Sequence, residues 1–513
     1  MLTKNIEKSR GQVTFVSIED LVPCDHLVRD LDKAIDFNFI YPLVEDLYCK
    51  DNGRPSIDPV CLFKILFTQY IFGIRSLRQT VKEIDVNMAY RWFVGLDITD
   101  QVPHFSTIGK NYERRFKDTK IFEDIFSIIL EEAINDNFVK ADEIFIDSTH
   151  IKASANKHKT RKVLIHKEAK KYKYKLDKEI REDREEHNKK PFDDDNGDGE
   201  SEIVQSTTDP DSGEFHKGEH EKMFAYSAHT VCDRNNFILA TEVTSGNIHD
   251  SVVFEDIYLK AISKFPNTKH VVMDAGYKTP YIAKLVFDDD REPIFPYTRP
   301  KTWKDKLSKR EYVYDSYYDH YICPNGEILY YSTTNRQGYK EYKSNSKTCK
   351  LCELKGKCTV SKQKTVTRHL WQKYIDKAEE QRLTPEHKAI YKKRSETIER
   401  VFADAKEKHG MRYTQYRGKE RVKNSIILTF ACMNLKKLAK WKKKIREESM
   451  ELIHKIQEKI SNIPIKLKNP TNLQEKPRTT YRCSGLCRQA ETPRRNGAFV
   501  KISANDISYL AKA

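Results

Sequence analysis

The sequence predicts a mixed α/β protein in which two neighbouring strands carry carboxylates, preceded by a helical region. The apolar run 144–146 leads directly into Asp147, and the run 271–273 leads into Asp274 in the same way. Short continuous apolar runs are typical of strands buried on both faces. Adjacent strands that each end in a carboxylate would offer the hard oxygen ligands that Mg²⁺ prefers. Each aspartate alone is explained more simply as a turn or cap residue.

Charge and composition point to nucleic acid as a partner. The chain has 513 residues, enough for two or three domains, and its 92 Lys and Arg against 76 Asp and Glu give a net charge of +16. Excess positive charge on a large protein favours binding to a polyanion. No apolar run approaches the roughly 20 residues of a membrane span. We therefore expect a cytoplasmic protein with no membrane partner, and eleven cysteines are too few for a disulfide scaffold of this size.

The first 136 residues are expected to be helical. Residues 1–53 are interpreted as a short N-terminal arm. Residues 54–136 are interpreted as a helix-turn-helix-like DNA-binding domain, because Asp58 and Ser76 are good helix caps and a third, basic helix begins near residue 106. Arg78 and Lys110 are the candidate DNA contacts in this domain. The alternative is a plain helical bundle with a solvated basic face.

Residues 137–445 are expected to form the catalytic domain. After the strand at 144–146, the pattern predicts a hairpin at 223–231 and 237–244, a helix at 252–264 and the strand that ends at Asp274. This order matches the start of a ribonuclease H-like fold, with carboxylates on its first and fourth strands. A charged insertion is expected over 155–222. Its acidic run at 193–200 lacks the ligand spacing of a calcium-binding loop, so calcium is not expected.

A second, Cys-rich insertion is expected over residues 300–380. Cys349 and Cys352 form a C-x2-C pair, with Cys323 before them and Cys358 after them. In a reducing compartment four such cysteines indicate a structural zinc site. Free thiols remain the alternative.

A long helix is predicted from Thr384 to His409. Thr384 is a good cap and Pro385 suits the first position. Glu399 and Lys406 are two turns apart on one side of this helix, which would suit a carboxylate on a metal and an ammonium on a phosphate. Residues 446–513 are interpreted as a polar tail.

Together these segments resemble the bacterial insertion-sequence transposases of the DDE type, over roughly residues 54–440. Gly53-Arg54-Pro55, Ser76-Leu77-Arg78 and His104-Phe105-Ser106-Thr107 resemble the InsH-type N-terminal domain. Ile146-Asp147-Ser148-Thr149 and Met273-Asp274-Ala275-Gly276-Tyr277 resemble the first and second aspartate motifs, and residues 394–406 the glutamate helix.

The resemblance implies metal-dependent phosphoryl transfer on DNA. Asp147, Asp274 and Glu399 would hold two Mg²⁺ (or Mn²⁺) ions roughly 3.5–4 Å apart. Lys406, Arg394 and Tyr391 would grip phosphates beside the scissile bond. The interval from Arg394 to Glu399 is one residue longer than in some relatives, which leaves Glu396 as a competitor for the metal.

The partners implied by the resemblance are double-stranded DNA, as element ends and target, and a second copy of the chain. The protein would then be nucleoid-associated and act as a homodimer on DNA. The alternative function is a catalytically inactive or repurposed DNA-binding protein on the same fold. A simple nuclease would not explain the N-terminal helices. His150 and His249 lie near the expected site and are interpreted as packed or surface histidines.

Overall fold

The computed structural model describes Val13 and residues 15–49, 56–166, 172–192, 200–217, 221–299 and 305–461. Two compact units divide the chain, Met1–Met450 and Glu451–Ala513. The acidic run at 193–199 lies outside the described residues, as does the polar tail from residue 462 onward. Among the described helices none is long and apolar enough to cross a membrane.

The N-terminal part of the first unit is helical, as predicted. Asp58 accepts a hydrogen bond from the Val60 N–H at the start of the fourth helix, and Ser76 caps the fifth. A helix that was not predicted follows, capped by Asn87 and ended by Gly95 in the left-handed conformation (φ 85°). The helices are α1 (Ile18–Leu21), α2 (Leu27–Ala34), α3 (Ile40–Val44), α4 (Pro59–Ile71), α5 (Leu77–Val86), α6 (Met88–Val94), α7 (Phe105–Asn111) and α8 (Ile121–Asn135).

The described residues of the N-terminal arm do not form a separate arm. Val28, Leu31 and Ile40 are fully buried in the same hydrophobic core as α4. Helix α2 packs on α6, and α3 packs on α4 and α8. The apolar residues of these short helices fall on one face, and burying that face fixes them to the neighbouring helices. The helical region therefore begins before residue 54.

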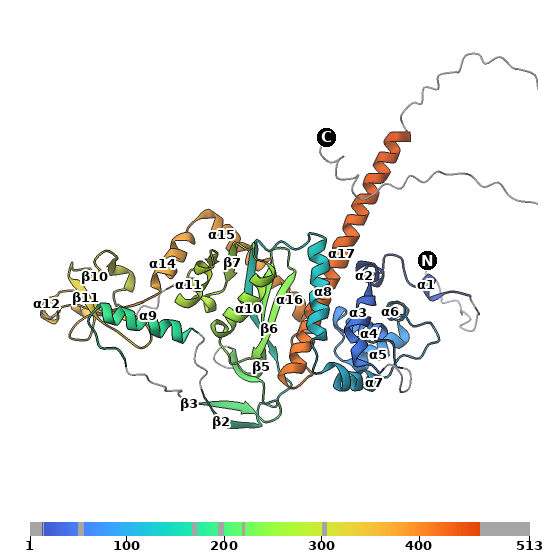
Figure 1. Cartoon of the computed structure of the whole chain (residues 1–513), viewed down its shortest axis with the longest axis horizontal. Coiled ribbons are helices and arrows are strands. Elements are labelled where there is room, and N and C mark those ends of the chain that lie inside the picture. Colours follow the sequence, from blue (N-terminus) through green and yellow to red (C-terminus); the bar gives the residue numbers. More distant parts are fainter. Residues whose placement is uncertain are drawn as a thin grey trace, which may run out of the picture. The chain divides into compact units, whose positions relative to one another are not determined.

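A six-stranded mixed sheet forms the centre of the unit (Figure 1). The strand order is β4-β5-β1-β7-β8, and β6 also pairs with β5. The first strand, β1, is antiparallel to β5 and parallel to β7, and the predicted hairpin is β5–β6. The strands are β1 (Glu143–Lys152), β4 (Gly213–Lys217), β5 (Glu221–Asp233), β6 (Ile238–Ser245), β7 (His270–Met273) and β8 (Glu292–Ile294).

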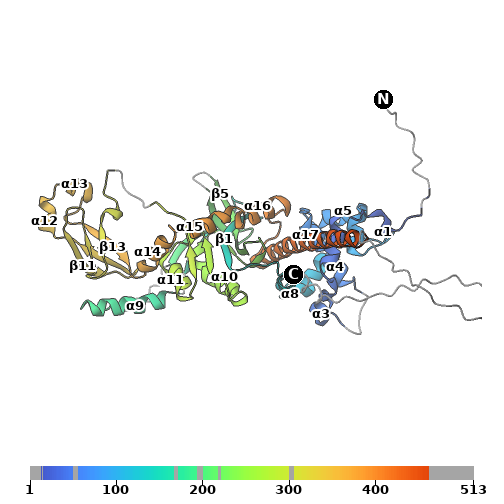
Figure 2. The same cartoon turned by 90° about the horizontal axis from the view of Figure 1, so that it is seen from above.

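Helices cover the sheet on both faces, which explains the continuous apolar runs of β1 and β7. Helices α10 (Asp250–Lys264) and α11 (Pro280–Asp288) lie on one side of β1. Helices α15 (Pro385–Lys392) and α16 (Ile398–Lys408) lie on the other side in the view of Figure 2. The predicted helix at 252–264 corresponds to α10.

The first strand does not end at Asp147, contrary to the prediction. It continues to Lys152, because Thr149 and Ile151 keep one face buried. Pairing with β7, however, stops at Ile146 opposite Met273. Farther along, the Lys152 N–H donates to the Arg412 carbonyl at 3.1 Å. On this edge of β1, Asp147 therefore lies between the part paired with β7 and the part bonded to Arg412. This gap leaves the Asp147 carboxylate open to groups from other elements.

The predicted helix from Thr384 to His409 is broken in the middle. Helix α15 ends at Lys392, a 3₁₀ turn covers Lys393–Ser395, and α16 begins at Ile398. Thr397 has φ −107° and ψ −100°, far from helical values. This break turns the chain so that residues on both sides of it face β1.

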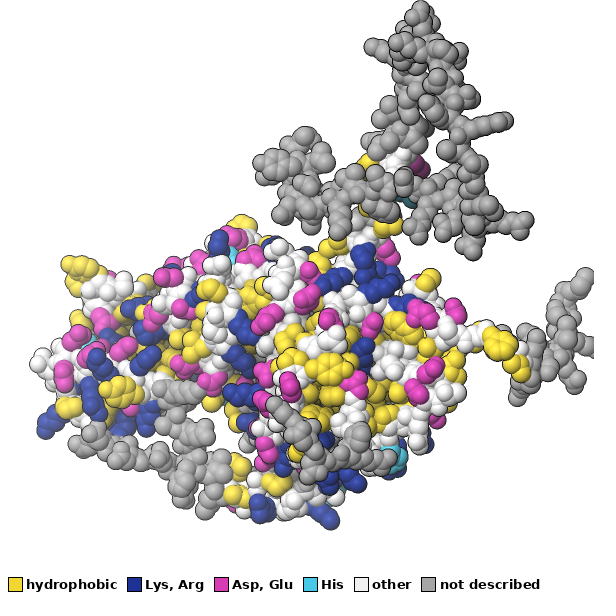
Figure 3. All heavy atoms as spheres, turned by 45° about the vertical axis from the view of Figure 1, so that its right-hand side comes forward, with side chains coloured by type: hydrophobic (Ala, Val, Ile, Leu, Met, Phe, Trp, Pro, Cys, Tyr) yellow, Lys and Arg dark blue, Asp and Glu magenta, His cyan; other side chains and the backbone are white. Residues whose placement is uncertain are grey.

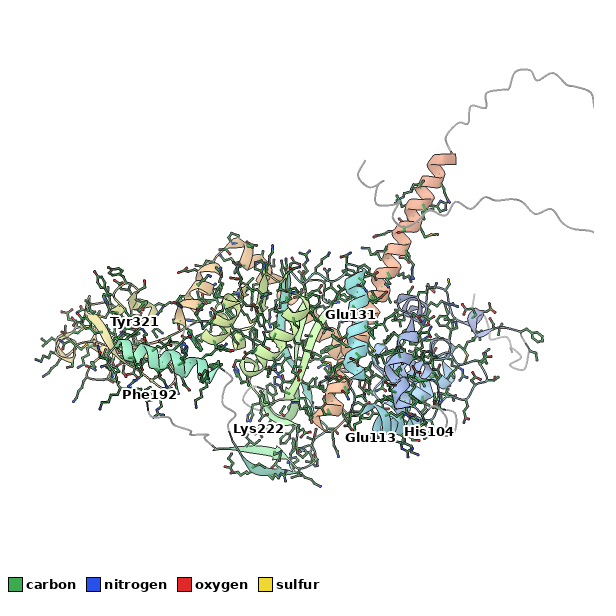
Figure 4. All side chains as sticks on the ribbon, in the orientation of Figure 1. His104, Glu113, Glu131, Phe192, Lys222 and Tyr321 are labelled. Atoms are coloured by element: carbon green, nitrogen blue, oxygen red, sulfur yellow. The ribbon has the colours of Figure 1, made fainter. Side chains whose placement is uncertain are left out.

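The two predicted insertions pack on each other. Helix α9 (Lys173–Glu186) contacts β11 of a second sheet, and Arg184 donates to the Thr334 carbonyl at 2.7 Å. Figure 4 shows Phe192 beside the end of α9, where Arg184 lies over its ring. The elements are β2 (Thr160–His166), β3 (Glu200–Ser206), β9 (Val313–Asp315), β10 (His320–Ile322), β11 (Ile328–Thr334), β12 (Tyr339–Lys343), α12 (Ser346–Leu351), α13 (Lys355–Cys358), β13 (Thr365–His369) and α14 (Gln372–Gln381).

Helix α17 (Lys419–Ser461) ties the sheet to the helical region within the first unit. Buried Asn434 accepts from the Ile238 N–H at 2.9 Å and donates to the Ile238 carbonyl at 2.8 Å, which fixes α17 to β6. On the other side, the Tyr70 hydroxyl of α4 donates to Ser425 at 3.0 Å. A pair of this kind satisfies polar groups that would otherwise be buried without partners.

The end of α4 meets the end of α16 at close range. Gly73 has φ +65°, and a Cβ there would stand 2.5 Å from the Lys408 carbonyl oxygen. Buried His409 donates from Nδ1 to the Tyr70 carbonyl at 2.7 Å, because the carbonyl can only accept. Burial lowers the pKa of His409 to about 4. The imidazole is therefore neutral in the folded protein at neutral pH.

His409 should make the protein sensitive to acid. Its folded pKa of about 4 lies below the ordinary value of 6.5, so its contribution to stability is full above pH 6.5 and is lost as pH falls toward 4. The loss reaches about 3 kcal/mol. Urea unfolding of the wild type between pH 7 and 4 should show it. His409→Asn keeps an N–H donor for Tyr70 without a titrating ring, so its stability should fall less over this range. Parallel curves for the two proteins would contradict this assignment.

Candidate active site

Three carboxylates from three separate elements meet around one guanidinium. Asp147 lies in β1, Asp274 directly follows β7, and Glu399 is in the first turn of α16. Arg394 donates a short hydrogen bond to Asp147 and lies 3.4 Å from both Asp274 and Glu399. The structure therefore brings together the three residues that the sequence predicted as metal ligands.

Arg394 contacts carboxylates in the structure, and its predicted DNA contact stays a prediction. It was expected to grip DNA, and the structure places it among the carboxylates, with 8% of the residue exposed. The preceding residue fixes this position, because Lys393 donates to both carboxylate oxygens of buried Glu143 at 2.8 and 2.9 Å. The 3₁₀ turn is thus held at the start of β1 while Arg394 reaches the gap beside Asp147.

The three carboxylates differ in exposure. The Asp147 side chain is 16% exposed, whereas Asp274 and Glu399 are about half exposed, at 47% and 53%. Burial raises the pKa of Asp147 to about 6, against the opposing effect of the Arg394 charge. The cluster is thus closed toward the sheet at Asp147 and open to solvent at the other two.

The competing glutamate, Glu396, precedes the start of α16. Glu396 is exposed, and its backbone carbonyl accepts a hydrogen bond from the Asn236 side chain at 3.0 Å. It sits in the break between the 3₁₀ turn and α16, so it does not share a helical face with Glu399. The extra residue between Arg394 and Glu399 is absorbed by this break.

Tyr391 lies near Arg394 and feels the charges of Asp274 and Glu399, and Lys406 lies farther along α16. Half-buried Lys406 lies near His150, and its charge adds to the burial that lowers the pKa of His150. The His150 ring stacks on Phe215 at 3.6 Å, and His249 caps α10 by accepting from the Ser251 N–H. His150 is therefore packed against a ring and His249 is an exposed helix cap, in line with the expectation of a packed or surface histidine.

A fourth carboxylate near the site was not singled out from the sequence. Asp250, the first residue of α10, lies 3.5 Å from Nδ1 of buried His229, and its charge raises the pKa of Asp147. Burial lowers the pKa of His229 to about 4, so this ring is neutral at neutral pH. The sequence signal was present in His249-Asp250-Ser251, which indicated only a helix start.

The candidate DNA contacts of the helical region are exposed. Arg78 on α5 lies over the Phe105 ring at 4.6 Å, and Lys110 is at the end of α7. His104, labelled in Figure 4, caps α7. On the face drawn in Figure 3, Lys and Arg are interspersed with acidic side chains and apolar ones. DNA contact in this region therefore stays a prediction.

The four cysteines of the second insertion line one small cavity. Cys323, Cys349, Cys352 and Cys358 all border it, together with Leu307 and Leu354. The cysteines are free and partly buried. Among the residues that the structure describes, the neighbouring core is small, and its buried members are Tyr312, Tyr321, Leu329, Tyr342 and Val366. Small cores of this size are commonly reinforced by a metal or disulfides.

The carboxylate cluster fits a hard divalent cation. Its donor set consists of three carboxylates on separate elements, and one positive group already contacts all of them. Carboxylate oxygens are the ligands that Mg²⁺ and Mn²⁺ prefer. Water can reach the site through Asp274 and Glu399. The arrangement can therefore support hydrolysis or transfer of a phosphate ester.

Two family models match the chain. Residues 16–114 match a transposase domain (DUF772), and residues 322–439 match a transposase DDE domain. The second match contains Arg394, Glu399, Lys406 and the four cysteines, whereas Asp147 and Asp274 precede it. No curated protein matches the chain. DDE domains have a ribonuclease H-like fold, in agreement with the mixed sheet.

Proposed function

We propose that this chain, which belongs to the insertion-sequence DDE transposases, cleaves DNA at the terminal repeats of its element and joins the ends to a target. The observation that carries this proposal is the convergence of Asp147, Asp274 and Glu399 around a single cationic group. These residues would hold Mg²⁺ or Mn²⁺. When bound, such ions activate water or a DNA 3′-hydroxyl and stabilise the leaving oxygen.

Lys406 and Tyr391 orient DNA in this proposal. Lys406 supplies a positive charge on the Glu399 helix, and Tyr391 stands beside Arg394. A phosphate held at these groups would lie next to the carboxylates. Arg78 and Lys110 would contact DNA through the helical region. Because these contacts would use separate regions of the chain, DNA binding can survive the loss of catalysis.

Two further features belong to the proposal. The four cysteines of the second insertion would bind a structural zinc ion, supported by their shared cavity. The chain would act as a homodimer on double-stranded DNA, so that two catalytic sites process two element ends. The protein would act in the cytoplasm and associate there with the nucleoid.

The function can be tested on DNA that carries the terminal repeats flanking the gene. We expect the purified full-length chain to nick or cut at the repeat ends with Mg²⁺ or Mn²⁺. No cutting is expected with a chelator or on DNA with scrambled repeats. Cleavage should proceed by in-line attack and leave no protein attached to DNA. Specific binding to the repeats without cleavage, with either ion, would instead support the catalytically inactive DNA-binding alternative.

A further inference from the structure

A second cluster of metal-ligating side chains lies at the opposite end of β7 from Asp274. His270 begins β7, Glu292 begins β8, and His387 is in the first turns of α15. Glu292 Oε2 stands 3.3 Å from His270 Nε2 and 2.9 Å from His387 Nε2. One ligand atom from each residue lies within 4.8 Å of the other two.

These distances fit a metal centre. Ligands bound tetrahedrally at about 2.0–2.1 Å from zinc are about 3.3 Å from one another. The two separations between Glu292 Oε2 and the imidazole Nε2 atoms, 2.9 and 3.3 Å, are close to that value. The imidazole rings are nearly perpendicular, at 84°, and both direct Nε2 toward the same carboxylate oxygen. Two imidazoles and one carboxylate with an open position are a known zinc donor set.

The surroundings of the cluster combine burial on one side with access from solvent on the other. His387 is only 4% exposed, and its Nδ1 is buried without a hydrogen-bond partner. Gln381 donates to Glu292 Oε1 at 3.2 Å, while its own carbonyl oxygen is buried without a partner. The Glu292 side chain is 41% exposed, which leaves a path from solvent. A metal on Nε2 of His387 would leave the ring proton on Nδ1, so the support for the site rests on the placement of the three ligand atoms and on the burial of His387.

We propose that His270, Glu292 and His387 bind a zinc ion, separate from the Mg²⁺ site and from the four cysteines. Imidazole nitrogens favour zinc over Mg²⁺, which prefers oxygen ligands. The ion would join α15 to the starts of β7 and β8. Helix α15 leads directly into the 3₁₀ turn with Arg394 and then to Glu399. Zinc would therefore stabilise the position of the 3₁₀ turn and of Glu399, which face Asp274 at the other end of β7.

The alternative is a metal-free cluster in which Glu292 accepts hydrogen bonds from both rings. The two cases differ in metal content. Cobalt(II) distinguishes this site from the cysteines, because cysteine thiolates give an intense charge-transfer band and the His/Glu site gives only weak visible bands. In the chelator-stripped full-length protein, cobalt should produce these weak bands. His387→Gln should remove them and leave any thiolate band unchanged.

Zinc retention provides the second measurement. Cys349→Ser/Cys352→Ser protein should retain zinc after dialysis, and adding Glu292→Gln should weaken binding more than about 100-fold, since even outer-shell changes cost 10–100-fold. His454→Gln, which alters an exposed histidine of α17, is the matched control and should change neither readout. Because Gln still accepts a hydrogen bond, Glu292→Gln should remain folded.

Two outcomes would overturn the proposal. One is a wild-type cobalt spectrum that His387→Gln and His270→Gln leave unchanged. The other is a cysteine-substituted protein with no more zinc than the chelator-stripped wild type. Both readouts measure metal binding rather than DNA cleavage. The proposal can therefore fail or succeed independently of the proposed transposition activity.

Discussion

Asp147→Asn protein should bind repeat DNA like the wild type and cleave it at least about a thousandfold more slowly. Asp147 is the most enclosed of the three carboxylates, and it lies in the gap between the two partners of β1. An amide has nearly the same shape but carries no charge, so it would bind a divalent cation far more weakly. Asp274→Asn should behave in the same way. Single-turnover cleavage and a parallel binding titration separate the two effects.

A surface carboxylate provides the control for this loss. Asp288→Asn changes an exposed residue of α11 that pairs with Lys284, and it should leave cleavage unchanged. Thermal unfolding should show that Asp147→Asn remains folded. Cleavage by Asp147→Asn at the wild-type rate would remove the basis for assigning this residue to the metal.

Glu399→Gln should abolish cleavage, whereas Glu396→Gln should retain most of it. Glu399 lies 3.4 Å from Arg394, within the cluster, while Glu396 is exposed in the break before α16. The two changes have the same chemistry and are three residues apart, so each serves as the control of the other. We expect a difference of at least about a hundredfold in single-turnover rate.

The reverse result would identify Glu396 as the ligand. Loss of cleavage only in Glu396→Gln would require the break at Thr397 to rearrange on DNA. Equal loss in both variants would indicate that the whole turn, rather than one carboxylate, controls the reaction. Each result is readable because DNA binding is measured in the same samples.

The sequence predicted the neighbouring strands well because their signal is local. Apolar runs that end in Asp147 and Asp274 depend only on burial of adjacent residues, and β1 pairs with β7 beside both. The hairpin β5–β6 was equally visible through its alternating pattern and its Asp233 turn. The alternation of Thr149 and Ile151 is also consistent with the extension of β1 to Lys152. The change from a continuous to an alternating apolar pattern nevertheless suggested that the strand ended at Asp147.

The arrangement around Arg394 could not be predicted in the same way. Helical periodicity runs through residues 385–408, and nothing in it marks the break at Thr397. Tertiary contacts that periodicity does not report, such as the hydrogen bond from Lys393 to Glu143, lie beside the break. The cluster of His270, Glu292 and His387 joins three elements far apart in sequence, so no spacing indicates it. The sequence did not show that the helices before residue 54 belong to the main core. Each of them is short, and their burial depends on partners later in the chain.

The position of Arg394 has a thermodynamic consequence. A guanidinium that contacts all three carboxylates competes with a divalent cation for the same oxygens. The apparent metal affinity is then reduced by the fraction of molecules in which Arg394 occupies them. A DNA phosphate that draws Arg394 away would raise that affinity, and by reciprocity the metal would raise the affinity for DNA. Arg394 would thus act as an internal counter-ion that lowers metal binding, and with it cleavage, until DNA is bound.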